Sequence, residues 1–421
     1  MSYLHTLNRR GMGRSRLLTS CLASFIYIHC VASVSKSAAS TDAYFTLNSD
    51  QVSCFSTQGN YRNYMEDEVF IAEHQPHDGR QFAFVGAFDG HGGNSVSRYL
   101  KRNLFPHLLA NLSPSVGRQS AFMTSDDEDV DEHDPNLKPN YDNNKIKKMD
   151  QSMLPTLEDY CDALKTSFRI VDDAIQSVSH WSFQGSCAVC CILVNIEDVF
   201  PDGYDEVDSI SPLSFEREGI TLKRAAIIGN IGDSRAVLSR IGFAIPLTED
   251  HKPNRTKERQ RIESCGGHVK WCGAVDKKTG VPIDRTGVYR VNGNLAVSRA
   301  IGDRSERPFV GSEVDVFSRF LSEEDEFIIV ASDGIWDVMT SQEAVSFVRS
   351  RVDNFNKALS ESNAKNIKNS SSRENNLKSA GLSSKSYVKE SEKPNIAYDL
   401  CNEAIIRGST DNITVIILWL Q

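Results

Sequence analysis

Five short apolar runs are the feature of this chain that most restricts its fold. They are six to nine residues long and rich in β-branched and aromatic side chains, and they lie at 82–88, 186–194, 225–231, 327–332 and 413–420. Runs of this length and composition are typical of buried β-strands. Because they are apolar on both faces, parallel and antiparallel sheets remain equally open on this pattern.

Amphipathic helices are predicted between the strands. Apolar residues recur every four positions from Val96 to Leu112, and at alternating steps of four and three from Leu157 to Val178. A third candidate helix, Lys257 to Cys265, stops at Gly266, a residue that suits a helix C-terminus. With 421 residues the chain could hold two or three domains. Strands near both of its ends instead favour one large α/β domain over residues 41–421.

A leader is expected over residues 1–40. Four arginines between Arg9 and Arg16 precede an uncharged stretch from Leu17 to Ser35, and small residues follow it. This is the layout of a secretory signal peptide or signal anchor. An organelle transit sequence and a plain cytosolic tail are the alternatives. We therefore slightly favour a secretory or membrane-anchored location, in which any membrane contact would be made through this segment only.

Three polar segments are expected to be insertions in the domain, at about 117–150, 197–219 and 353–395. The first contains seven acidic residues in nine positions (126–134), which favours a solvated loop over a metal-binding one. The second carries Pro201, Gly203 and Pro212. The third is rich in Ser, Asn and Lys, and its composition predicts that it cannot bury enough surface to become ordered.

Acidic residues stand at the ends of the strand-like runs. They are Glu66 and Asp67 before Val69, Asp89 after 82–88, Asp233 after 225–231, Asp333 after 327–332, and Asp411 before 413–420. A single Asp-Gly pair is ordinary turn chemistry. Several carboxylates that converge from rigid strands would repel one another unless a cation held them. Oxygen ligands of this type suit Mg²⁺ or Mn²⁺ better than zinc.

Two further residues suit phosphate chemistry. Arg62 lies four residues before Glu66 and could bind phosphate oxygens through two parallel hydrogen bonds. His91 follows Asp89 closely and has a side chain suited to giving a proton to a leaving oxygen. Two cations about 4 Å apart can clamp a phosphoryl group for in-line displacement. The pattern thus indicates metal-dependent phosphate chemistry.

Eight motifs in order along the chain carry a specific resemblance. They are RNYMED at 62–67, FDGHGG at 88–93, GSCA at 185–188, GNIGDSRAV at 229–237, LTEDHKP at 247–253, NLAVSRAIGD at 294–303, ASDGIWDV at 331–338 and GSTDNITV at 408–415. Together they resemble the metal-dependent protein serine/threonine phosphatases of type 2C, the PPM family. The resemblance extends over roughly residues 54–420.

The resemblance implies a fold and a ligand set. The fold would be α+β, a four-layer α-β-β-α sandwich with two antiparallel sheets flanked by helices. Asp89 would bridge two Mg²⁺ or Mn²⁺ ions, with the Gly90 carbonyl and Glu66 on one ion. Asp333 and Asp411 would hold the other ion. Asp233, together with Asp333, resembles the pair that binds a weaker third ion in some members.

The resemblance also implies an activity. Arg62 would orient the phosphate, His91 would be the general acid, and Asp67, Asn412 and Ser332 would support the ligands. The reaction would be hydrolysis of phosphoserine and phosphothreonine on proteins by a metal-bridging water or hydroxide, without a phosphoenzyme. The protein partners would be phosphorylated substrates, and the chain would be a monomer.

Two other functions are possible for such a set of acids. A catalytically inactive relative that binds phosphoproteins is the alternative, but inactive relatives usually lack one or more of these acids. A binuclear nuclease, or any nucleic-acid binder, is disfavoured by the net charge of −9.

The chain departs from the family pattern in two places. Gly311–Val314 replaces a usual proline-acid step, and Cys187 replaces a threonine, which we expect to be a packing change.

Overall fold

The computed structural model describes residues 44–45, 51–74, 81–112, 155–196, 199, 224–283, 287–374 and 395–420. The predicted leader at 1–40 and the acidic insertion at 117–150 lie outside the described residues. Of the insertion at 197–219, only Val199 is described. Within the described ranges, no helix is both long and apolar enough to cross a membrane.

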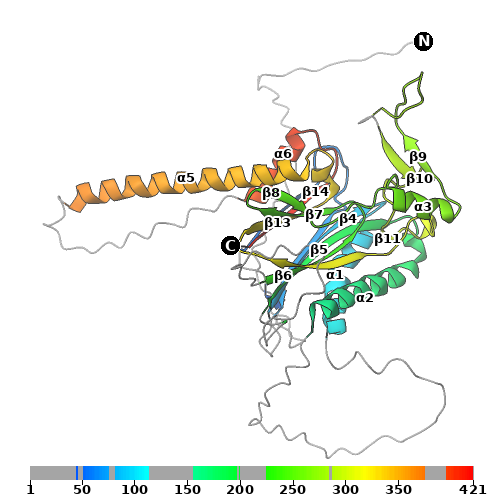
Figure 1. Ribbon diagram of the computed structural model, residues 1–421, viewed down its shortest axis with the longest axis horizontal. Coiled ribbons are helices and arrows are strands. Elements are labelled where there is room, and N and C mark those ends of the chain that lie inside the picture. The colour runs from blue at the N-terminus through cyan, green and yellow to red at the C-terminus, as the bar shows by residue number, and fades with distance from the viewer. Residues whose placement is uncertain are drawn as a thin grey trace, which may run out of the picture. The chain divides into compact units, whose positions relative to one another are not determined.

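Two large antiparallel sheets form the centre of the fold (Figure 1). The first contains, in spatial order, β1 (Tyr44–Phe45), β3 (Glu68–His74), β4 (Phe82–His91), β5 (Gly185–Asn195), β6 (Arg224–Ile231) and β12 (Asp315–Leu321), and β11 (Ile301–Gly302) also pairs with β5. The second contains β2 (Val52–Thr57), β14 (Ile413–Trp419), β13 (Asp325–Ala331), β7 (Arg235–Arg240) and β8 (Phe243–Pro246). Every strand pair in both sheets is antiparallel, which decides the question that the apolar runs left open.

Alternating side chains explain why the strands are apolar on both faces. In β4, Val85 and Ala87 point into the core between the two sheets, whereas Phe84 and Phe88 point to the opposite side. Successive residues of a strand face opposite sides of its sheet, so a strand buried on both faces reads as a continuous apolar run. The five predicted strands are confirmed for this reason.

Helices cover the outer face of each sheet. The first sheet is covered by α1 (Ser95–Leu112) and α2 (Leu157–Gln176), which lie on the same side of its strands in Figure 1. The second is covered by α4 (Asp333–Trp336), α5 (Ser341–Glu374) and α6 (Ile396–Ile406). The molecule is therefore a four-layer α-β-β-α sandwich, as the family resemblance implied. The two predicted amphipathic helices are confirmed as α1 and α2.

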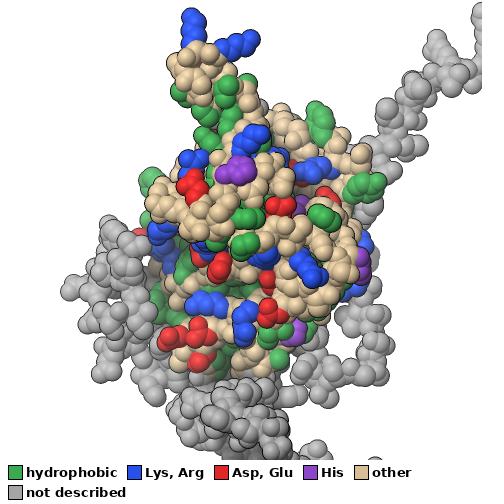
Figure 2. Space-filling view, turned by 90° about the vertical axis from the view of Figure 1, so that its right-hand side faces the viewer, with side chains coloured by type: hydrophobic (Ala, Val, Ile, Leu, Met, Phe, Trp, Pro, Cys, Tyr) green, Lys and Arg blue, Asp and Glu red, His purple; other side chains and the backbone are tan. Residues whose placement is uncertain are grey.

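The third predicted helix is confirmed as α3 (Thr256–Ser264). It ends before Gly266, whose φ of +88° is a conformation that favours glycine. A hairpin of β9 (Val269–Cys272) and β10 (Val288–Val291) follows it and stands out at the top of Figure 2. Val275 and Val281 in the hairpin loop are about half exposed.

The expectation for residues 353–395 is wrong in its first part. Helix α5 continues through that stretch to Glu374. Its start packs on the second sheet through Ala344, Val345 and Val348, whereas residues 353–358 are mostly exposed. Ser, Asn and Lys do not prevent a helix that is already nucleated by packing from continuing in solvent. A polar composition therefore predicts low burial but does not exclude a helix that extends from a packed segment.

Candidate metal centre

The predicted acids meet at one end of the sandwich, where three strands finish. Asp89 lies near the end of β4 in the first sheet, opposite Cys187 of β5. Asp333 follows β13 of the second sheet and begins α4. Asp233 lies in the turn from β6 to β7, which carries the chain from the first sheet to the second. The two sheets thus supply carboxylates to a single point between them.

Asp89, Asp233 and Asp333 form a close group. One carboxylate oxygen from each lies within 4.8 Å of the others. Burial and the charges of the neighbouring aspartates raise the pKa of both Asp89 and Asp333 well above its usual range. Three carboxylates held this close on rigid elements suit a hard divalent cation, which would replace the mutual repulsion by attraction.

Asp67 lies beneath this group and is 3% exposed. One of its carboxylate oxygens accepts hydrogen bonds from Ser332 Oγ at 3.0 Å and Thr414 Oγ1 at 2.7 Å. The other oxygen, Oδ1, is buried and finds no hydrogen-bond donor among the described residues. Burial raises the pKa of Asp67 to about 6, although the two hydroxyls oppose that shift. This unpaired buried oxygen, together with the carboxylates of Asp89, Asp233 and Asp333, fits a bound cation or a water molecule on that cation.

Glu66 is held in place by the glycine-rich turn after β4. Its Oε1 accepts a hydrogen bond of 2.6 Å from the backbone N–H of Gly93, and its own N–H donates to Asn412 Oδ1 at 2.8 Å. A Cβ on Gly90 would lie 2.5 Å from the backbone oxygen of Glu66 and 2.7 Å from Ser97 Oγ. Only glycine at position 90 lets these two backbone segments approach so closely.

Arg62 binds Asp411. The guanidinium Nη2 forms an ion pair with Asp411 Oδ2, and the Arg62 side chain remains 46% exposed. Burial by itself would lower the pKa of Arg62, but the charge and hydrogen bond of Asp411 raise it, so the guanidinium stays charged. Arg62 therefore reaches the edge of the acidic group with guanidinium N–H groups still open to solvent.

His91 pairs with Asp303, which precedes the short turn at Arg304–Glu306. The distance between His91 Nε2 and Asp303 Oδ2 is 2.7 Å, and Asp303 is 2% exposed. Burial alone would lower the pKa of His91, but the charge and hydrogen bond of Asp303 raise it. The pair favours a protonated imidazole, which can donate a proton.

Both oxygens of Asp233 already accept hydrogen bonds. Cys187 Sγ lies 3.2 Å from Oδ1, and Lys252 Nζ lies 2.5 Å from Oδ2. Burial raises the pKa of the Cys187 thiol, so it stays protonated and donates. The expectation that Cys187 is only a packing change is therefore incomplete, because its thiol contacts a predicted metal ligand.

The turn that carries Asp233 is clamped by His251. The backbone N–H of Gly232 donates to His251 Nδ1 at 3.0 Å, and the backbone N–H of His251 donates to the Gly232 carbonyl at 2.8 Å. His251 Nε2 in turn lies 3.0 Å from Asp315 Oδ2.

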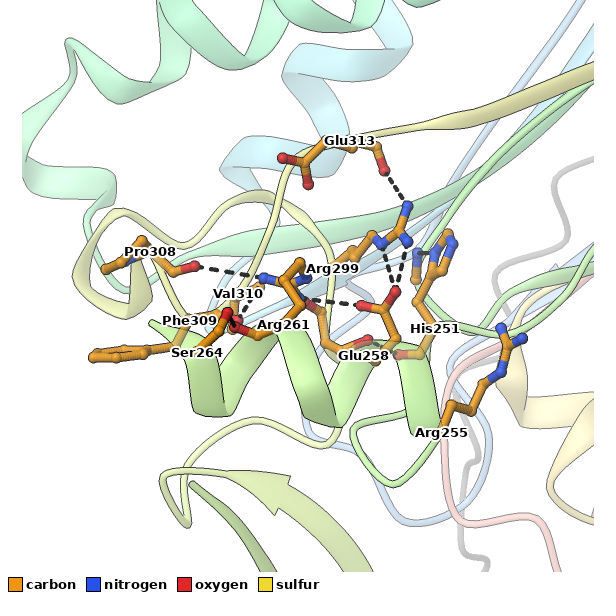
Figure 3. A network of polar contacts seen from close by, with 12 residues as sticks. His251, Arg255, Glu258, Arg261, Ser264, Arg299, Pro308, Phe309, Val310 and Glu313 are labelled. Carbon is orange, nitrogen blue, oxygen red and sulfur yellow. Dashed lines mark hydrogen bonds and ion pairs between the residues drawn. The ribbon is translucent and has the colours of Figure 1, made fainter. Parts of the chain in front are cut away.

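Figure 3 shows how this clamp continues into α3. Arg299 pairs with Glu258, which also pairs with Arg261. Arg299 Nη1 also lies 3.1 Å from Asp315 Oδ1, and Asp315 is the partner of His251. Burial alone would raise the pKa of Glu258, but Arg299, and after it hydrogen bonds from Ser298 and Arg261, lower it to about 2. Arg299 Nη1 also donates to the Glu313 carbonyl, so the unusual 311–314 segment joins the same network.

Comparison with known proteins decides the family. The model that describes protein phosphatase 2C matches residues 137–413, which is more than half of the chain. The chain belongs to the protein phosphatase 2C family. The matched stretch includes the motifs of Asp233, Asp333 and Asp411, whereas those of Arg62, Glu66, Asp89 and His91 precede it.

Individual relatives agree with the family. The chain is 32% identical over 272 residues to "Probable protein phosphatase 2C 52" of Oryza sativa subsp. japonica, covering 65% of this chain and 39% of that protein. It is 32% identical over 276 residues to "Probable protein phosphatase 2C 11" of Arabidopsis thaliana, covering 65% and 51%. The chain thus spans about half or less of the length of these curated relatives.

Solved structures share the fold. "Crystal structure of serine-threonine phosphatase 2C from Toxoplasma gondii" is similar with a TM-score of 0.53 at 18% identity, covering 90% of this chain and 99% of that one. "Structure of a C.elegans sex determining protein" gives a TM-score of 0.52 at 21% identity, covering 88% and 64%. The shared fold therefore covers a larger part of this chain than the residues 137–413 that the family model matches.

In this protein phosphatase 2C chain, the predicted site residues fall into four groups. Asp89, Asp233 and Asp333 lie close to one another, Arg62 pairs with Asp411, Glu66 is fixed beside Gly90 and Gly93, and His91 pairs with Asp303. Their assigned roles stay predictions. Sequence reasoning gave no role to Asp303, His251 or Lys252, each of which contacts a predicted site residue or its turn. All three lie inside quoted motifs, and that position was the one signal that could have drawn attention to them.

Proposed function

We propose that this chain is a metal-dependent protein phosphatase that hydrolyses phosphoserine and phosphothreonine on protein substrates. The observation that carries the proposal is the convergence of Asp89, Asp233 and Asp333 from both sheets in a protein phosphatase 2C chain. The flanking basic residues, Arg62 and His91, supply the two remaining chemical needs of phosphate-ester hydrolysis. These needs are charge on the phosphate oxygens and a proton for the leaving oxygen.

Two Mg²⁺ or Mn²⁺ ions would be held by carboxylates and one backbone carbonyl. Asp89 would serve both ions, Glu66 and the Gly90 carbonyl would serve one, and Asp333 and Asp411 the other. Asp233 would contribute to a third, weaker position. When bound, such ions neutralise phosphate charge and lower the pKa of water enough to make it a nucleophile at neutral pH.

Arg62 would hold the phosphoryl group. It is anchored through one nitrogen to Asp411 and is 46% exposed, so other guanidinium N–H groups can donate to phosphate oxygens. The anchor restricts the side chain to the edge of the acidic group, which reduces the entropy lost when phosphate binds.

His91 would protonate the departing serine or threonine oxygen. Asp303 raises the pKa of His91 and so favours the imidazolium form that can donate a proton. After transfer, the Asp303 carboxylate again favours uptake of a proton from solvent, and the 26% exposure of the His91 side chain gives solvent access.

The nucleophile in this proposal is water and not a side chain. Cys187, whose thiol contacts Asp233, is buried, and its raised pKa keeps it a thiol. A thiol is a poor nucleophile compared with a thiolate. We therefore expect no phosphoenzyme, and solvent oxygen should appear in the released phosphate.

The test is phosphate release from a phosphothreonine peptide by the full chain in Mn²⁺, Mg²⁺ or excess EDTA, in water enriched in ¹⁸O. The proposal predicts turnover with either metal, none in EDTA, and one solvent oxygen in each phosphate. Turnover that persists in EDTA after full metal removal would contradict metal dependence. Absence of turnover from folded protein that has bound Mn²⁺ would contradict the phosphatase function.

A further inference from the structure

Lys252 places a positive charge on the carboxylate of Asp233. Its Nζ lies 2.5 Å from Asp233 Oδ2, and the Asp233 side chain is 4% exposed. The other Asp233 oxygen accepts from Cys187. An ammonium at this distance occupies one of the lone-pair positions of that oxygen and repels a cation that approaches the same carboxylate.

The backbone beneath Lys252 is fixed, but its side chain has a second partner. His251 clamps the Gly232 turn through its own backbone N–H, which donates to the Gly232 carbonyl, and through its imidazole Nδ1, which accepts from the Gly232 N–H. Residues 251 and 252 therefore approach Asp233 from a defined position. Asp337 Oδ1 lies 3.9 Å from the same Nζ, and Asp337 is 62% exposed. A small rotation of the flexible lysine stem could therefore carry the ammonium from Asp233 to Asp337.

We propose that Lys252 is an internal competitor for the Asp233 cation position, and that a cation binds there only when the ammonium moves to Asp337. The inference rests on the proposed metal-dependent function. It makes cation binding at this one position depend on where the Lys252 ammonium lies. The positions served by Asp89, Glu66 and Asp411 do not contact Lys252 in any described hydrogen bond or ion pair. Lys252 thereby acts as a positioning residue that separates one weak cation position from the rest.

The test is a titration of the full chain with Mn²⁺, in which free Mn²⁺ is followed by its electron paramagnetic resonance signal. Lys252→Met should tighten the weakest resolved site by about tenfold, since one competing charge is removed from a partly buried pair. Lys252→Gln should also tighten Mn²⁺ binding at that site, and it replaces Lys252→Met in the test if the methionine variant does not fold. Lys165→Met, which removes a lysine paired with Asp162 on the surface of α2, should leave all sites unchanged.

A double-mutant comparison tests the second partner. Asp337→Asn should weaken the weakest site in the wild-type chain, because the displaced ammonium loses its acceptor. In the Lys252→Met background the same change should have a clearly smaller effect. When Asp233→Asn is combined with Lys252→Met, the tighter Mn²⁺ binding produced by Lys252→Met should be lost.

The outcomes separate the two proposals. If the wild-type chain binds no Mn²⁺, the metal-dependent function and this inference both fail. If it binds Mn²⁺ but Lys252→Met and Lys252→Gln leave the weakest site unchanged or weaker, the inference alone fails. Equal effects of Asp337→Asn with and without Lys252 would also overturn it.

Discussion

The imidazole Nε2 of His91 lies 2.7 Å from Asp303 Oδ2, although 212 positions separate the two residues in the sequence. Asp303 adopts a left-handed backbone conformation with φ of 45°, which directs its buried carboxylate toward the end of β4. Aspartate and asparagine tolerate this conformation better than most residues. The pair links the loop before Arg304 to the residue proposed to donate the catalytic proton.

The Asp303→Asn variant should shift the pH dependence of turnover. Without the carboxylate charge the pKa of His91 falls, so the protonated donor is lost at a lower pH. The high-pH limb of kcat should move to lower pH, and kcat at pH 8 should drop about tenfold. The measurement is kcat against pH on a phosphothreonine peptide. Asp173→Asn, at an exposed acid, is the control and should leave the profile unchanged. Identical pH profiles for wild type and Asp303→Asn would refute the role of Asp303 in keeping His91 protonated.

Metal-free protein should become more stable as the pH falls from 7 toward 5. The raised pKa values of Asp67, Asp89 and Asp333 mean that the folded chain binds protons more tightly than the unfolded chain in this range. Such groups add stability as pH falls through the folded pKa, which is about 6 for Asp67. Thermal unfolding in EDTA at the two pH values measures this. Asp89→Asn should reduce the difference in melting temperature between pH 5 and pH 7. If the wild type instead melts at a higher temperature at pH 7, and Asp89→Asn melts in the same way, this explanation is wrong.

Glu258→Gln should lower the free energy of unfolding by about 3 kcal/mol at pH 7, because it removes the carboxylate that Arg299 and Arg261 share. The folded pKa of about 2 lies below the ordinary 4.5, so this contribution is complete above pH 4.5 and disappears as pH falls toward 2. Urea unfolding at pH 7 and pH 3 should show the difference from wild type shrinking. The half-exposed Glu263 on the same helix gives the control Glu263→Gln, for which we expect a change below about 1 kcal/mol.

Gly90→Ala should impair activity more than stability. The added Cβ would meet the backbone oxygen of Glu66 at 2.5 Å, and that backbone is fixed by hydrogen bonds to Asn412 and Ser97. We expect kcat to fall about a hundredfold, because displacement of catalytic groups by about 1 Å has effects of this size. Gly280→Ala is the comparison, since a Cβ at Gly280 meets nothing within 4 Å. Its φ of +69° makes the substitution cost some stability, but kcat should stay near the wild-type value. Near-normal kcat for Gly90→Ala would show that the close approach is not required.

The sequence predicted the strands well, but it could not give their direction. Phe84 and Val85 are buried on opposite faces of one strand, and that pattern is the same in a parallel and an antiparallel sheet. The layered antiparallel arrangement came from the family resemblance. The prediction for 353–374 failed because a composition argument considers burial, whereas α5 is extended from a packed first segment.

The candidate ligands were predictable because each acid stands beside a strand end, which the sequence shows. Their supporting contacts were not. Asp303 reaches His91, and Lys252 reaches Asp233, through contacts between segments far apart or separated by a turn. Local sequence patterns do not show which distant residues come into contact. The sequence therefore placed Asp303 and Lys252 in motifs but did not predict their partners.

Phosphate hydrolysis by this chain is proposed to depend on a metal centre formed by the carboxylates of Asp89, Asp233 and Asp333. The most direct measurement is phosphate release by Asp89→Asn in saturating Mn²⁺, beside Asp399→Asn as a control on α6. The account predicts that Asp89→Asn folds like the wild type and loses at least about a thousandfold in kcat/KM, or ~4 kcal/mol, while the control stays active. An Asp89→Asn variant with wild-type turnover would contradict it.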